Sequence, residues 1–216
     1  MKKEVKSMGT SEAMTSLLDL VREFKVAPGQ QPNFMGMERR IAEKAAAIER
    51  AAIQDVLQEL DLDAPRVLIG GEPYTRVGQE QGVYHTFAGD VVVNRTLYQK
   101  AGDQDSEVVD CVSLGAGVIL DGWLPETAKG AAFLVQAVTP REAEAITKNV
   151  GRLPYSRSSL ERVTHATGKI YMSDQDRIDH AQTVALDLPE EARSMSISLD
   201  RVSVPMEEPR PRVWFS

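Results

Sequence analysis

The chain has little cysteine, few histidines and no long apolar run, and each shortage excludes a class of protein. Among 216 residues there is one cysteine, Cys111, so an internal disulfide and a multi-cysteine zinc site are both excluded. No apolar run approaches the roughly 18 residues that a membrane span needs, and the charged start Met1-Lys-Lys-Glu is not followed by the apolar core of a secretory signal. We therefore expect a cytoplasmic protein that makes no membrane contact, with Cys111 as a small buried hydrophobe.

The three histidines, His85, His165 and His180, are dispersed along the chain. No spacing among them matches a zinc site. We expect structural or solvent-exposed roles for them.

Positive charge is scarce overall, with 25 Lys and Arg against 32 Asp and Glu and a formal net charge of −7. This balance counts against a protein that coats nucleic acid without specificity, because such binding depends on Lys and Arg neutralising phosphates. The charge is uneven, since residues 139–169 contain six Lys or Arg against three Glu. One DNA-facing segment in an otherwise acidic protein is compatible with this pattern.

Residues 1–64 are expected to be helical. One helix is predicted from Thr10 to about Val26, and a second from Met37 to Leu60. The second helix repeats apolar residues at steps of three and four, namely Ile41, Ala45, Ile48, Ala52, Val56 and Leu60. This pattern suits a hairpin with the first helix and equally a coiled-coil homo-oligomer, so both alternatives stay open.

Residues 65–123 are expected to form a small antiparallel sheet. Strands are predicted at 67–69, 83–87 and 91–98, with Ala88-Gly-Asp90 as the tight turn between the last two. The polar stretch 102–107 is expected to be a loop.

Residues 124–172 are expected to contain a helix-turn-helix. A helix over 127–138 is followed by Thr139-Pro140, an N-cap and first-position pair that opens a second helix to about Val150. Gly151 ends that helix, and Ser156 is predicted to cap a third helix that continues past His165. A helix, a glycine-containing turn and a capped helix are the outline of a helix-turn-helix, although helical hairpins share it.

The second helix of such a motif places its first residues toward the bases in the major groove. The candidate DNA contacts are therefore the residues at the start of the predicted helix: Ser156, Arg157, Ser158, Glu161 and Arg162. Ser156 is also expected to help bind a phosphate at the helix N-terminus.

Residues 173–216 are expected to hold a linker and one buried strand. Small polar and apolar residues alternate from Ser196 to Leu199, and the alternation breaks at Asp200. On pattern alone Asp200 is a turn or edge residue.

From Arg66 to Pro209 the chain resembles the N-terminal part of bacterial insertion-sequence transposases of the ISKra group, a DDE-type family. The segments that carry this resemblance are Tyr84-His-Thr-Phe-Ala-Gly-Asp90, Arg95-Thr-Leu-Tyr98, Val112-Ser-Leu-Gly-Ala-Gly-Val118, Asp121-Gly-Trp-Leu-Pro-Glu-Thr-Ala128, Arg141-Glu-Ala-Glu-Ala145, Gly151-Arg-Leu-Pro-Tyr-Ser-Arg-Ser-Ser159 and Ser198-Leu-Asp-Arg-Val-Ser-Val-Pro-Met-Glu-Glu-Pro209.

The resemblance implies a ribonuclease H-like catalytic domain in which three carboxylates hold two Mg²⁺ or Mn²⁺ ions for phosphoryl transfer. Asp200 matches the first carboxylate, as a catalytic residue and metal ligand, and the other two are expected beyond Ser216. We therefore expect an α+β fold consisting of a helical hairpin, a small antiparallel sheet, a helix-turn-helix and the first strand of an incomplete catalytic domain.

The function implied is that of a truncated transposase that binds transposon-end DNA and lacks transposition activity. The alternative is a non-enzymatic DNA-binding protein that competes with an intact transposase. A third hypothesis is a helical oligomerisation module led by residues 37–60.

Overall fold

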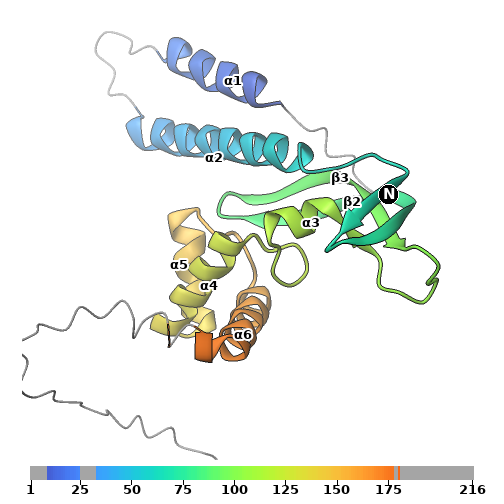
Figure 1. The fold of residues 1–216 in the computed structure, drawn as a ribbon. Coiled ribbons are helices and arrows are strands. Elements are labelled where there is room, and N and C mark those ends of the chain that lie inside the picture. Colours follow the sequence, from blue (N-terminus) through green and yellow to red (C-terminus); the bar gives the residue numbers. More distant parts are fainter. Residues whose placement is uncertain (1–8, 25–32, 178–179, 181–216) are drawn as a thin grey trace, which may run out of the picture. The chain divides into compact units, whose positions relative to one another are not determined.

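A computed structural model describes residues 9–24, 33–177 and 180 (Figure 1). The fold is α+β, as predicted, and its four strands form one antiparallel sheet in the order β1-β2-β3-β4. Residues up to Ser173 belong to one compact unit, and Asp174 begins a second. The elements are α1 (Thr10–Glu23), α2 (Phe34–Gln58), β1 (Arg66–Ile69), β2 (Glu72–Thr86), β3 (Gly89–Lys100), β4 (Val109–Asp110), α3 (Cys111–Ala116), α4 (Pro125–Ala137), α5 (Pro140–Val150) and α6 (Arg157–Ser173).

Helices α1 and α2 lie side by side as an antiparallel pair (Figure 1). The Thr10 hydroxyl at the start of α1 donates to the Asp55 carboxylate near the end of α2 at 2.6 Å, and Lys44 donates to the Ser16 hydroxyl at 2.6 Å. Residues buried in these two helices are Ala13, Leu20, Met37, Ala51 and Leu57. The hairpin alternative for the N-terminal helices is thus confirmed within one chain.

The β2–β3 hairpin turns earlier than predicted. Thr86 pairs with Gly89, so the turn residues are Phe87 and Ala88, and the expected turn at 88–90 is wrong. The Thr86 hydroxyl accepts from the Ala88 N–H at 3.1 Å and donates to the Gly89 carbonyl at 2.7 Å. These two bonds close the turn before Gly89, whose φ of +111° suits glycine.

Strand β2 begins at Glu72, well before the predicted start at Val83. Its first part is mostly exposed and its register shifts between Arg76 and Gly78, so no alternation of apolar and polar residues marks it. Strand β4 and helix α3 were also not predicted. The Asp110 carboxylate begins α3 by accepting from the Ser113 N–H at 2.6 Å.

Two hydrophobic cores lie within the unit that ends at Ser173. The first joins α2, the sheet and α3 through Leu57, Tyr84, Val91, Val93 and Val112. Burying each of these side chains stabilises the fold by roughly 1.5–3 kcal/mol. The second core joins the last three helices through Trp123, Ala128, Ala131, Ala143, Leu160 and Val163.

The ends of α5 and α6 agree with the predicted capping residues. Thr139 and Glu142 form a capping box at the start of α5, and Gly151 ends that helix with a φ of +72°. The Ser156 hydroxyl accepts from the Ser159 N–H at 3.3 Å at the start of α6. Within the part of the chain that the structure describes, no helix combines the length and apolar character that crossing a membrane requires.

Candidate nucleic-acid interface

Helices α4, α5 and α6 pack on one another around the second core. The connection between α5 and α6 spans residues 151–156, which is longer than the three or four residues usual in a helix-turn-helix. Leu153 in this connection is buried with a φ of +54°, and its N–H donates to the Phe87 carbonyl at 2.8 Å. The turn between the helices is therefore fixed to the tip of the β2–β3 hairpin.

The tip of the hairpin is held between the helices by side chains from both sides. A Cβ on Gly130 of α4 would lie 2.5 Å from the Phe87 ring, so a larger residue at this position would displace the ring. The Arg152 guanidinium lies 5.6 Å from the centroid of the same ring and also pairs with Glu49 of α2. The position of α5 and α6 against the sheet is thus set by contacts with the hairpin and with α2.

An aromatic cluster at this junction was not predicted from the sequence. The rings of His85, Trp123 and Tyr155 have centroids 4.5 to 5.1 Å apart. His85 Nδ1 lies 2.6 Å from Asp90 Oδ1, and the Tyr155 hydroxyl donates to the Thr86 carbonyl at 2.7 Å. Burial and the nearby Asp90 carboxylate raise the pKa of Tyr155 well above its usual value, so this hydroxyl stays protonated.

The N-terminus of α6 already has a carboxylate near it, that of Glu144. The Glu144 carboxylate accepts from Lys148 Nζ at 2.9 Å, and it lies near enough to the backbone N–H of Arg157 for that group to affect its pKa. The bond from Lys148 is the largest cause of the lowered pKa of Glu144, and the Arg157 amide adds to it. Because the carboxylate complements the positive end of the helix dipole, it competes with the phosphate expected at Ser156.

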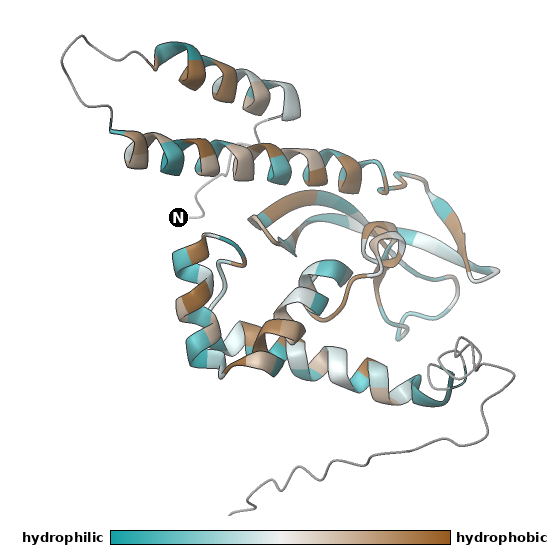
Figure 2. Ribbon diagram, turned by 90° about the vertical axis from the view of Figure 1, so that its left-hand side faces the viewer, coloured by the Kyte–Doolittle hydropathy of each residue, from teal (hydrophilic) through white to brown (hydrophobic). Residues whose placement is uncertain are grey.

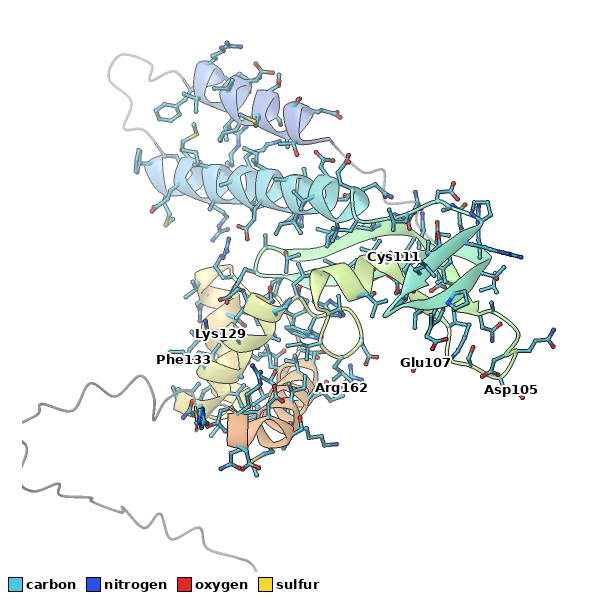
Figure 3. All side chains as sticks on the ribbon, in the orientation of Figure 1. Asp105, Glu107, Cys111, Lys129, Phe133 and Arg162 are labelled. Carbon is cyan, nitrogen blue, oxygen red and sulfur yellow. The ribbon has the colours of Figure 1, made fainter. Side chains whose placement is uncertain are left out.

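The solvent side of α6 is polar from Ser158 to Lys169, before the exposed Ile170, Tyr171 and Met172 near its end. Ser158, Arg162, His165 and Lys169 follow one another at steps of four, three and four residues, so they lie on one face of the helix, and all are exposed. We call these four residues the α6 outer face. Leu160 and Val163 on the opposite side are buried in the second core. Figure 3 shows Arg162 extending from α6 away from that core.

The cations around the α6 outer face differ in how firmly they are paired. Arg162 lies 3.7 Å from Asp121, but both side chains are about two-thirds exposed, which makes this a weak interaction. Lys169 makes no salt bridge with any other residue in the ranges 9–24, 33–177 and 180. Arg157 is exposed at the first position of α6. These side chains are available to a polyanion at little cost.

The predicted catalytic and metal residue, Asp200, lies outside the described residues, as does the strand expected before it. Within residues 9–24, 33–177 and 180, no group of three or more His, Cys, Asp or Glu is placed to hold a metal ion. Of the predicted site residues, Ser156, Arg157, Ser158 and Arg162 are described, and all four lie in the first two turns of α6 or at its cap.

No family model, curated protein or solved structure matches this chain.

Proposed function

We propose that α4–α6 bind double-stranded DNA through the α6 outer face, and that the chain acts as the DNA-binding N-terminal region of a DDE-type transposase. The observation that supports DNA binding is the α6 outer face itself. Its polar and basic side chains are exposed, while the other side of the helix is buried in the second core. The resemblance to ISKra-group transposases supplies the transposon end as the expected DNA.

The chemistry of the α6 outer face suits a DNA groove. An α-helix fits the major groove, where an Arg guanidinium can donate two hydrogen bonds to one guanine. Arg162 lies in the second turn of α6, within the part of the helix that reaches base edges in this geometry. Lys169 and Arg157 then serve as phosphate contacts, and the weak Arg162–Asp121 pair gives way on binding.

Acidic residues limit how strongly this surface attracts DNA. Glu161 lies beside the α6 outer face, and Glu144 occupies the N-terminus of the helix. With the two phosphate contacts from Lys169 and Arg157, we expect log Kd to change with log salt with a slope of about 2. This predicts modest affinity and binding that depends on sequence more than on net charge.

The test is selection of bound duplexes from a random-sequence pool, followed by a salt titration of the selected DNA by fluorescence anisotropy. Lys169→Ala should lower the slope by about 1, whereas only Arg162→Ala should relax the selected sequence. Arg22→Ala is the matched control, because Arg22 is an exposed cation on α1.

No binding at low salt would reject DNA binding, and so would equal slopes for the three variants. A selected sequence that is absent from the ends of an element carrying this gene would reject the transposase assignment alone. The two parts of the proposal can therefore fail separately.

A further inference from the structure

We propose that one side of the α1–α2 hairpin is a docking surface for a second copy of this chain. Met14, Leu18 and Val21 follow one another at steps of four and three residues, so they lie on one face of α1. These side chains are 52, 53 and 55% exposed, although Ala13 and Leu20 of the same helix are buried. A row of half-exposed large apolar side chains marks an interaction surface more often than a solvent face.

Helix α2 continues this apolar surface. Ile41, Ala45, Ala52 and Val56 are spaced at four, seven and four residues and share one face of α2, where Ile41 and Val56 are exposed. Figure 2 shows apolar turns along both helices. We call these α2 residues, together with Met14, Leu18 and Val21, the hairpin apolar side.

The opposite side of the hairpin is charged. A groove of about 590 Å³ between the two helices is lined there by all three acidic residues of α1, which are Glu12, Asp19 and Glu23. Arg40 and Lys44 of α2 line the same groove. This groove is thus lined by charged residues, in contrast to the row of apolar side chains formed by Met14, Leu18 and Val21.

The sizes of the side chains favour a second copy as the occupant. On α1 the hairpin apolar side presents large residues, whereas the middle of its α2 part consists of two alanines, Ala45 and Ala52, between Ile41 and Val56. A copy related by a two-fold axis places the large residues of its α1 over the alanines of α2, and the reverse contact follows by symmetry. Two hairpins stacked in this way form a four-helix bundle, in which each helix pair covers the apolar side of the other.

The extent of the surface is sufficient for a stable dimer. Six large apolar side chains between 37 and 66% exposed belong to it or to its edge at the start of α2: Met14, Leu18, Val21, Phe34, Ile41 and Val56. Together with the alanines they present an area on the order of the 800 Å² per partner that a standard interface buries. Because the contact is apolar, salt should strengthen it slightly or leave it unchanged, in contrast to DNA binding.

The first test is sedimentation equilibrium of the full chain across a wide concentration range. We expect a monomer–dimer equilibrium in which Leu18→Glu raises the dimer Kd by about a hundredfold or more, because a carboxylate would be buried without a partner. Thr15→Glu is the matched control, since it adds the same charge to the same helix on the charged side, and its Kd should equal that of the unaltered chain. Far-UV circular dichroism checks that both variants keep their helices.

The second test identifies the faces in contact. In a Cys111→Ser background, Leu18→Cys protein mixed with Ala45→Cys protein should form a disulfide-linked heterodimer on oxidation, while Thr15→Cys mixed with Ala45→Cys should not. A chain that is monomeric at all concentrations would overturn the proposal, as would a dimer that tolerates Leu18→Glu or equal cross-linking in the two mixtures. Arg162→Ala should leave the dimer intact, so this outcome is independent of the proposed DNA binding.

Discussion

The outer sides of α1 and α6 repeat at the same spacing of three and four residues, yet they carry opposite chemistry. Met14, Leu18 and Val21 make the exposed side of α1 apolar, whereas Arg162, His165 and other polar residues line the exposed side of α6. Both helices bury their other side, so the difference does not arise from how they pack. Two helices of one unit thus expose different chemistry, which is why we propose an apolar partner for α1 and an anionic one for α6.

The largest expected effect comes from removing the core beneath α6. Trp123→Ala deletes the only tryptophan described in the second core, where its ring packs on His85 and Tyr155, and should lower the free energy of unfolding by about 3–5 kcal/mol. Urea unfolding measures this, with Phe133→Ala as control because Phe133 is 75% exposed. DNA binding should be lost while self-association through α1–α2 persists. Loss of both activities would show that the two helical regions depend on one cooperative core.

A smaller loss of unfolding free energy is expected when the charge network of Asp110 and Arg95 on the sheet is broken. The buried Asp110 accepts from Arg95 at 2.9 Å and from the Ser113 N–H that begins α3. Asp110→Ala leaves the Arg95 guanidinium without this partner and removes a helix cap, at a cost of about 2–3 kcal/mol in unfolding free energy. Asp105→Ala, in the exposed loop of Figure 3, should change it by less than about 0.5 kcal/mol. Equal stabilities of the two variants would contradict the network.

The capping box at α5 sharpens the comparison further, because α1 begins without a side-chain cap. Thr139→Ala should cost about 1 kcal/mol of unfolding free energy, and Thr15→Ala inside α1 serves as the control. Hydrogen bonds from Thr139 lower the pKa of Glu142 in the folded chain. The stabilisation is therefore fully present above the unfolded pKa of a glutamate and is lost as the pH falls through the lower folded value. A Thr139→Ala variant with an unchanged pH profile would show that the box contributes nothing.

The smallest expected effect is on the reactivity of the Cys111 thiol. This thiol can be labelled to probe the sheet region without any substitution there. Burial is the largest cause of the raised pKa of this thiol, and the Asp61 and Asp110 carboxylates raise it further. At pH 8 we expect a disulfide reagent to react with it at least about tenfold more slowly than in the urea-unfolded chain. The rate should stay slow in Leu18→Glu and Arg162→Ala, because neither outer side contacts the first core. Fast labelling of the folded chain would mean that this region opens readily.

Helix ends were predictable because the signals that set them are local. Thr139, Gly151 and Ser156 act through hydrogen bonds or backbone angles within a few residues of themselves, and the structure has α5 and α6 where these residues predict them. Strand ends depended on partners elsewhere in the chain. The early turn at Phe87 and the long exposed start of β2 follow from pairing with β3, for which the sequence of β2 alone has no period-2 signal.

The α6 candidate site was predictable in part. The exposed cap and first turns of α6 follow from local pattern, and Ser156, Arg157, Ser158 and Arg162 lie where that pattern places them. The Glu144 carboxylate at the helix N-terminus was not expected, because it depends on how α5 approaches α6. Asp200, the one residue proposed for catalysis, lies outside the described residues and stays a prediction.

The sequence predicted most of the helices, which of their residues share a face, and that the chain is acidic with one basic segment. These properties follow from helical periodicity and from capping bonds that span a few residues. Only the tertiary structure decided which faces are covered, because burial depends on residues far apart in the chain. The Tyr155 hydroxyl bonds to Thr86, 69 residues away, and Arg152 pairs with Glu49 across 103 residues. Contacts of this range place the polar side of α6 and the apolar side of α1 in solvent, and that placement makes each of them a candidate for binding.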